Sequence, residues 1–178
     1  MERIIKKGEN IYIRLPKYEE IAYISKLWSD VDTTGEVGGP FFLPEDKVSS
    51  WFQKMVHPTD GRNFYCLIFN NKDEPVGEVS FHRFDDLTKT AELNIKIESK
   101  HRGKGYAKEA LFLLLDYYFN EFGGEIMIDP VLLSNKKAQK MLLSFGFEYD
   151  PSNKEVFLLK ITKDMFNKIK DGLSHTLT

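Results

Sequence analysis

The stretch Arg102-Gly103-Lys104-Gly105-Tyr106-Ala107 is the most informative part of this 178-residue sequence. It lies between residues 91–97, where apolar and polar side chains alternate as in a strand, and residues 105–122, which read as a long apolar helix. A glycine-rich turn that leads into a helix directs several backbone N–H groups at one point, and the helix dipole adds partial positive charge there. The two glycines leave room for a ligand, and the two cations add full charges. The stretch therefore predicts a site for an anion such as phosphate.

Two glycine-rich phosphate motifs do not fit this stretch. A P-loop requires Gly-x-x-x-x-Gly-Lys-Ser/Thr, which the sequence lacks, and a dinucleotide motif that starts at Gly103 fails because its sixth position is Lys108. The pattern that fits is Arg/Gln-x-x-Gly-x-Gly/Ala, formed by Arg102, Gly105 and Ala107. An ordinary surface turn between a strand and a helix, or an unrelated phosphate-binding α/β protein, are the alternatives.

This pattern resembles the pyrophosphate-binding motif of the GNAT N-acetyltransferases. A second stretch extends the resemblance, because Asn135-Lys136-Lys137-Ala138 followed by Phe145-Gly146-Phe147 is similar to the family's Asn-x-x-Ala and Gly-Phe signature. The resemblance covers residues 63–159, where strand, loop, helix, strand and second helix follow the family's order. The first sixty residues match in layout only.

The resemblance implies that the chain binds acetyl-CoA as a cosubstrate. The pantetheine would pair with one strand as an added strand does, and the loop amides would hold the pyrophosphate. Each of these side chains also has a structural alternative: Asn135 can cap its helix, and Lys104 and Lys108 can be solvated lysines. His101, beside the loop, is either a further phosphate contact or a surface residue. The coenzyme-binding residues that the resemblance implies are Ile95, Lys96, Ile97, Arg102, Gly103, Lys104, Gly105, Tyr106, Ala107 and Asn135.

The order of the remaining segments predicts a mixed α/β fold. Antiparallel strands come first, and one strand–helix–strand crossover then joins residues 91–97 to residues 125–128, which is long enough for a parallel strand pair. The resemblance implies a GNAT-like acyl-CoA N-acyltransferase fold, with a mostly antiparallel central sheet, a splayed parallel pair and helices on both faces. Residues 8–171 are expected to form one domain and residues 172–178 to fray. We expect strands at 11–15, 64–69, 76–81, 91–97, 125–128 and 156–161, helices at 16–30, 44–57, 105–122, 134–146 and 163–170, and a loop at 31–43.

Composition narrows the class of protein. The net charge is −2, with both signs interleaved, so the basic stripe of a nucleic-acid binder is missing. No run of 18 apolar residues predicts a membrane span and no secretory signal is seen, so a cytoplasmic location is the default expectation. The single cysteine, Cys66, is expected in the core, and no metal framework is predicted. A homodimer is compatible with the sequence.

An amine must lose its proton before it attacks a thioester, because a lysine-like amine has a pKa of about 10.4. We expect Glu92, on the strand that leads to the coenzyme, to be the general base, and Asp129 is the weaker alternative. The structural alternative for Glu92 is a solvent-facing carboxylate or ion-pair partner on a strand. Strand amides near residues 94–96 would stabilise the oxyanion. Many members of the family place a tyrosine seven residues after the helix asparagine as the proton donor, where this chain has Leu142. Other donors would be Tyr149 or Tyr106.

The resemblance therefore implies an acetyl-CoA-dependent N-acetyltransferase that acts on a primary amine: a small amine, an aminoglycoside-like cation or a protein N-terminus. The alternative is a non-catalytic acyl-CoA-binding sensor, which Leu142 favours. In the family, the first helices and their loop wall the acceptor site. Here the three carboxylates of Asp30, Asp32 and Glu36 suit a cationic amine, and the alternative is that they are solvated in a surface loop. His82 either faces the same cleft or has a structural role.

Overall fold

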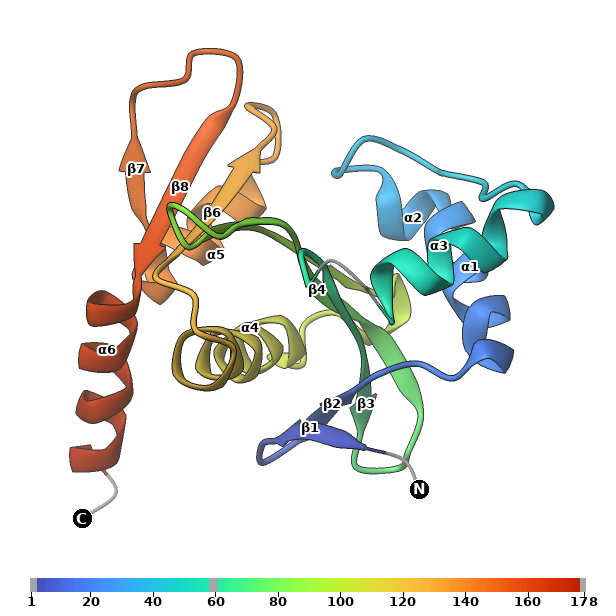
Figure 1. The fold of residues 1–178 in the computed structure, drawn as a ribbon, viewed down its shortest axis with the longest axis horizontal. Coiled ribbons are helices and arrows are strands. Elements are labelled where there is room, and N and C mark those ends of the chain that lie inside the picture. Colours follow the sequence, from blue (N-terminus) through green and yellow to red (C-terminus); the bar gives the residue numbers. More distant parts are fainter. Residues whose placement is uncertain (1–2, 58–60, 177–178) are drawn as a thin grey trace.

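Strands of both directions form one mixed sheet in the computed structural model, which describes residues 3–57 and 61–176 (Figure 1). The order across this sheet is β1-β2-β3-β4-β5-β6-β8-β7, and β5 and β6 are its one parallel pair within the described residues. The mixed, mostly antiparallel sheet that the sequence predicts is confirmed. The strands are β1 (Ile4–Lys7), β2 (Ile11–Arg14), β3 (Phe64–Asn70), β4 (Pro75–Asp85), β5 (Thr90–Ile97), β6 (Ile126–Val131), β7 (Glu148–Asp150) and β8 (Phe157–Thr162).

The parallel pair opens after a short paired segment. Residues 90–92 of β5 pair with residues 126–128 of β6, and the register ends there, although β5 continues to Ile97 and β6 to Val131. The two strands then diverge, with α4 lying below the opening in Figure 1. The edge of β5 beyond Glu92 therefore has no strand partner, and such an edge accepts an added extended chain.

Helices cover both faces of the sheet, as predicted. Leu111, Leu114 and Leu115 of α4 pack in the main core against buried side chains of β3 to β6. On the other face, α1 and α3 cover β3 through a second core that contains Ile24 and Phe52. The helices are α1 (Ile21–Ser29), α2 (Val31–Thr34), α3 (Val48–Met55), α4 (Tyr106–Tyr117), α5 (Lys136–Phe145) and α6 (Lys163–Thr176), with short helical turns at Tyr18–Glu20 (η1), Glu45–Lys47 (η2), Ser99–His101 (η3) and Tyr118–Phe122 (η4).

Three short elements differ from the expectations. The strands β1 and β7 lie outside the predicted strands and pair at the two edges of the sheet with β2 and β8. Residues 31–34, expected in a loop, form α2, because the side chain of Asp30 accepts from the N–H of Asp32 at 3.3 Å and from the hydroxyl of Thr33 at 2.5 Å. The expectation of a continuous loop was wrong there.

The C-terminal helix is longer than expected. α6 extends to Thr176, so residues 172–176 are helical where fraying was expected, and residues 177–178 lie outside the described residues. The helix is held to the sheet by Phe166, which is fully buried, and by Ile169, which packs on the same core. The single domain predicted for residues 8–171 stays a prediction, although β1 already pairs into the sheet before residue 8.

No helix within the described residues is both long and apolar enough to cross a membrane. Cys66 is a fully buried free thiol on β3, as expected.

Candidate active site

The predicted loop forms an open backbone cradle at the start of α4. Gly103 and Gly105 have φ angles of +77° and +79°, in the left-handed region that favours glycine. A Cβ at either position would meet no atom within 4 Å, so the space beside the loop is open. Within the described residues, no group accepts a hydrogen bond from the N–H groups of residues 103–107. These donors lie at the positive end of the α4 dipole and suit an anion.

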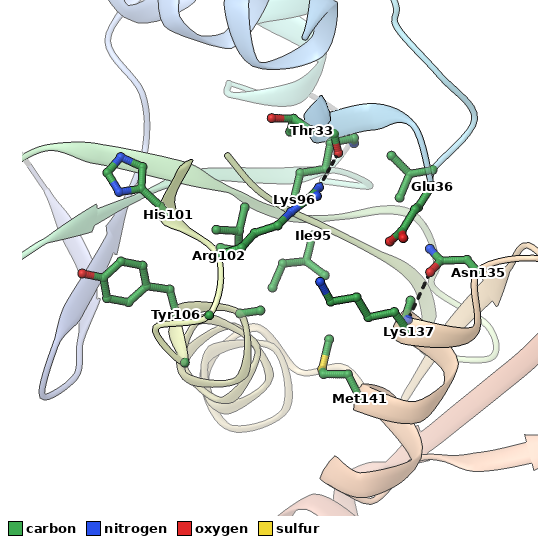
Figure 2. Close-up of a pocket in the computed structure, with 16 residues that line it drawn as sticks. Thr33, Glu36, Ile95, Lys96, His101, Arg102, Tyr106, Asn135, Lys137 and Met141 are labelled. Atoms are coloured by element: carbon green, nitrogen blue, oxygen red, sulfur yellow. Dashed lines mark hydrogen bonds between the residues drawn. The ribbon is translucent and has the colours of Figure 1, made fainter. Parts of the chain in front are cut away.

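A cavity, which we name the loop cavity, lies in front of this cradle. It is bounded by α4, the open end of β5, the segment that follows α2, and α5, and Figure 2 shows Ile95, Tyr106 and Met141 around it. Nine of the residues predicted to bind the coenzyme line it: Ile95, Lys96, Ile97, Arg102, Gly103, Gly105, Tyr106, Ala107 and Asn135.

Two further side chains of the loop cavity suit a phosphorylated ligand. The ring atom Nδ1 of His101 is buried without a hydrogen-bond partner, and an orphaned buried polar atom of this kind calls for a ligand or water. Lys137 extends from the first turn of α5 toward the centre of the cavity (Figure 2). The sequence reasoning missed Lys137, although it stands inside the Asn-x-x-Ala signature. In contrast, Lys104 is exposed, and its side chain does not line the cavity.

Arg102, which lines the loop cavity, also binds α2. Its guanidinium donates to the backbone carbonyls of Asp32 at 3.0 Å and Thr33 at 2.7 Å. The hydroxyl of Thr33 also accepts from the N–H of Ser99 at 3.0 Å. The loop that cradles the anion and the wall formed by α2 are therefore joined by hydrogen bonds, shown in part in Figure 2.

Asn135 begins α5 as its N-cap. Its Oδ1 accepts from the N–H of Ala138 at 3.1 Å, and the residue is 7% exposed. The capping role that the sequence left open is therefore present. Because the side-chain amide nitrogen has no partner within the described residues and Asn135 lines the cavity, a ligand contact stays compatible with the cap.

A second cavity, which we name the carboxylate cavity, lies where β5 and β6 separate. It adjoins the loop cavity, because Ile95, Asn135 and Met141 line both. Its ionisable side chains are Glu92 from β5, Asp129 from β6 and His82 from β4. The structure thus brings together the predicted base, its alternative and the histidine.

Asp129 is the most perturbed of these three groups. Burial, together with the negative charge of Glu92, raises its pKa from 3.8 to about 7. A donated hydrogen bond would favour the charged form of this carboxylate, but no group within the described residues donates one to it. A carboxylate with a pKa near neutral is suited to accept a proton from an amine at that pH.

Glu92 is more strongly engaged than Asp129. Nη1 of Arg83 lies 3.2 Å from its Oε2, and Nε2 of His82 lies 3.5 Å from the same oxygen. Burial lowers the pKa of His82 more than the neighbouring Glu92 raises it, so the imidazole is the neutral form at neutral pH. Glu92 is therefore an oriented carboxylate beside a neutral histidine and an arginine.

Leu142 lines the carboxylate cavity and is 1% exposed, at the position where the resemblance implies a tyrosine. Tyr149 stacks on Phe157 with ring centroids 4.4 Å apart and lines neither cavity, so the structure does not support it as the proton donor. Tyr106 lines the loop cavity.

Of the three carboxylates in the acidic loop, that of Asp30 is engaged in structural hydrogen bonds. Besides the contacts that cap α2, the carboxylate of Asp30 accepts a hydrogen bond from the hydroxyl of Ser99 at 3.3 Å. These hydrogen bonds lower the pKa of Asp30, and the bond from the hydroxyl of Thr33 has the largest effect. Asp32 is exposed, and Glu36 lines the loop cavity. Asp30 thus stabilises the corner between α1 and α2.

A buried polar network joins β4, β5 and α1. Glu78 on β4 is fully buried and accepts from Trp28 at 2.7 Å, from Asn94 at 3.2 Å, from Lys96 at 3.0 Å and from the hydroxyl of Tyr65. Because Asn94 and Lys96 belong to β5, this network fixes the strand that borders both cavities.

We expect Lys96→Met to lower the free energy of unfolding by about 3–5 kcal/mol, because it leaves the buried charge of Glu78 without its cation. Lys168→Met, which removes an exposed pair on α6, should cost less than about 1 kcal/mol. Urea denaturation of the two variants measures the difference. Equal losses would show that the pair of Lys96 and Glu78 contributes no more to stability than an exposed ion pair.

Comparisons with known proteins agree with this geometry. Residues 10–148 match the model of the acetyltransferase (GNAT) domain family. The uncharacterized N-acetyltransferase p20 of Bacillus licheniformis is 25% identical over 142 residues, which are 79% of this chain and 80% of that protein. The ribosomal-protein-serine acetyltransferase of Escherichia coli K12 is 27% identical over 113 residues, 64% of this chain and 62% of the relative.

The structure of spermidine N-acetyltransferase from Vibrio cholerae in complex with CoA and spermine shares the fold. It superposes with a TM-score of 0.77 at 17% identity and covers 88% of this chain and 98% of its own. The family model matches well over half of this sequence, and the open parallel pair and the free loop amides are in place. The chain therefore belongs to the GNAT acetyltransferase family and is a GNAT-type acetyltransferase.

Proposed function

We propose that this protein transfers the acetyl group of acetyl-CoA to a primary amine, by direct attack of the amine on the thioester. The observation that carries the proposal is the cradle of unbonded N–H groups at residues 103–107, which opens into the gap between β5 and β6. The acceptor would be a small amine, an aminoglycoside-like cation or a protein N-terminus. Two relatives, a spermidine N(1)-acetyltransferase and a ribosomal-protein-serine acetyltransferase, support a small amine and a protein as acceptors. A cytoplasmic location and a homodimer stay predictions.

The coenzyme would be held by the residues that line the loop cavity. The N–H groups of residues 103–107 would bind the pyrophosphate at the helix start, and Lys137 and His101 would add contacts from either side. The backbone of Ile95, Lys96 and Ile97 would pair with the pantetheine amides, because this edge of β5 has no strand partner. This arrangement places the thioester near the carboxylate cavity.

Deprotonation of the acceptor is assigned to the pair formed by Glu92 and Asp129. Glu92 stays the predicted catalytic carboxylate, which attracts the ammonium form, and Asp129, whose pKa is about 7, takes up the proton. Because the ionised form of Asp129 takes up the proton, the activity should rise with pH through values near 7. N–H groups of β5 near Asn94 would stabilise the oxyanion that forms at the thioester.

The departing thiolate needs no acid from the position of Leu142. A free thiol has a pKa of about 8.5, so the thiolate is a tolerable leaving group near neutral pH. The non-catalytic sensor that Leu142 favours would bind the coenzyme but release no thiol. The family match and the carboxylate pair favour the enzyme.

Glu92→Gln tests the role of the pair. We expect kcat to fall and the rise of activity with pH to move to lower pH, because loss of the negative charge lowers the pKa of Asp129. The Kd of CoA should stay within about twofold, since Glu92 does not line the loop cavity. Thiol release from acetyl-CoA with a panel of amines, measured across pH, gives both values. Turnover that survives intact with an unmoved profile would remove Glu92 from the mechanism.

A further inference from the structure

A third cavity, which we name the tryptophan cavity, continues the acceptor side of the site. Trp28 of α1 and Trp51 of α3 line it, and it shares His82 and Asn94 with the carboxylate cavity. The cavity that holds the carboxylate pair therefore adjoins a further space that an acceptor can occupy. What fills the tryptophan cavity decides which amine fits.

The charges of the cleft are divided between its two cavities. The carboxylate cavity carries Glu92 and Asp129, whereas the tryptophan cavity carries Lys54 and Arg83 and no Asp or Glu among its described lining residues. Lys54 has no ion pair within the described part of the chain. Arg83 uses Nη1 for Glu92, and its Nε and Nη2 make no hydrogen bond there. Its side chain is 75% exposed and open to a ligand.

The backbone at Arg83 has an uncommon conformation and is hydrogen-bonded, through one side chain, to the backbone of Lys54. Arg83 has a φ of +57°, which is rare outside glycine, and lies in a bulge where the register between β4 and β5 shifts. Bulges of this kind redirect side chains beside active sites. The side chain of Asn63, which is 6% exposed, accepts from the N–H of Arg83 at 3.3 Å and donates to the carbonyl of Lys54 at 3.5 Å. One buried amide thus joins the backbones of the two cationic residues.

Aromatic rings form the remaining wall. Trp28 and Trp51 meet edge to face with centroids 5.0 Å apart, and Trp51 meets Tyr65 in the same way at 5.2 Å. Trp28 and Tyr65 are fixed by their hydrogen bonds to Glu78. Ser80, which is 1% exposed, lines the cavity, and its hydroxyl makes no hydrogen bond within the described residues. A hydroxyl that lines the cavity beside fixed rings suits a ligand with a polar and an apolar part.

We propose that the acceptor is an aromatic α-amino acid with a free carboxylate. Its amine would lie at Glu92 and Asp129, its carboxylate at Arg83 and Lys54, and its ring against Trp28 and Trp51. A second ammonium group, as in a polyamine, would meet the two cations and be repelled. The inference rests on the proposed transfer to an amine and names its substrate class.

The two tryptophans of the sequence, Trp28 and Trp51, both line this cavity, so tryptophan fluorescence reports its occupation directly. We would titrate the protein with phenylalanine, with phenylalaninamide, which keeps ring and amine but lacks the carboxylate, and with spermidine. Phenylalanine should bind roughly tenfold or more tightly than the other two, because charge-assisted hydrogen bonds hold its carboxylate. In Lys54→Gln this preference should fall at least severalfold. Lys47→Gln, an exposed lysine outside the three cavities, is the matched control.

Thiol release with the same three amines separates this inference from the proposed function. Preferred binding of phenylalanine without thiol release would support the subsite and refute the acetyl transfer. Thiol release with spermidine or the amide preferred, or a preference for phenylalanine that Lys54→Gln leaves unchanged, would overturn the inference while the transfer stands. Absence of fluorescence change with all three ligands would also overturn it.

Discussion

Asp129→Asn should lower kcat for amine acetylation by about two to four orders of magnitude, the range that a general base contributes. The carboxylate lies in the cavity where β5 and β6 separate, and burial with the charge of Glu92 raises its pKa to about 7. Its ionised form, which accepts the proton, is populated above that pH. In the variant the rise of activity through pH 7 should disappear, because an amide does not titrate. The pH profile of thiol release at saturating acetyl-CoA measures both effects.

The same substitution should stabilise the fold at high pH. A folded-state pKa of about 7 above an unfolded value near 3.9 means that the folded protein binds more protons between those limits, so its stability falls as pH rises from about 4 to 7. Asparagine removes that loss. The free energy of unfolding of Asp129→Asn should exceed that of the parent by about 1–4 kcal/mol at pH 8, and the gain should vanish below about pH 4.

Asp150→Asn is the matched control, because the backbone N–H of Ser152 lowers the pKa of that carboxyl instead. Its replacement should destabilise the protein at pH 8, the opposite direction. An Asp129→Asn variant that is both slower and more stable would identify a group kept for chemistry at the expense of the fold. Full activity with an unchanged pH profile would exclude Asp129 as the base and return the role to Glu92.

The parts of the fold that sequence predicts are those with strong local signals. The alternation over residues 91–97, the glycines at 103 and 105 and the apolar spacing of α4 each specify an element, and the helical crossover from β5 to β6 allows the parallel pair. The missed elements are three or four residues long, and tertiary contacts make them. β1 and β7 exist because an edge strand was there to pair with, and α2 exists because Asp30 and Arg102 bond its backbone.

The site shows the same division. The loop residues and Asn135 stand in motifs, so the sequence indicates them. Asp129 lies 37 residues after Glu92 in the sequence. Its role depends on the divergence of β5 and β6, which places the two carboxylates in one cavity. Trp28 and Trp51 follow helical spacing and read as core positions in the sequence. The structure places both beside a cavity, where their partners come from β3 and β4.

The largest expected effect on the coenzyme is that of Gly105→Val, which should raise the Kd of CoA by about 100-fold or more. Valine cannot adopt a φ of +79° without strain, and its side chain would enter the open space beside the cradle, because a Cβ there meets no protein atom within 4 Å. Loss of two charge-assisted hydrogen bonds from the loop amides costs about 3–6 kcal/mol, which is about two orders of magnitude or more in affinity.

Gly123→Val is the matched control. Gly123 also has a positive φ, +101°, and open space around its Cβ, but it ends η4 and lies outside the loop cavity. Both variants should therefore lose similar stability, whereas only Gly105→Val should lose coenzyme affinity in calorimetric titration. The thermal shift given by saturating CoA should follow the same split, because a ligand stabilises only the fold that binds it. Tight binding of CoA by Gly105→Val would mean that the phosphates lie elsewhere, and the placement of the thioester beside β5 would then lose its basis.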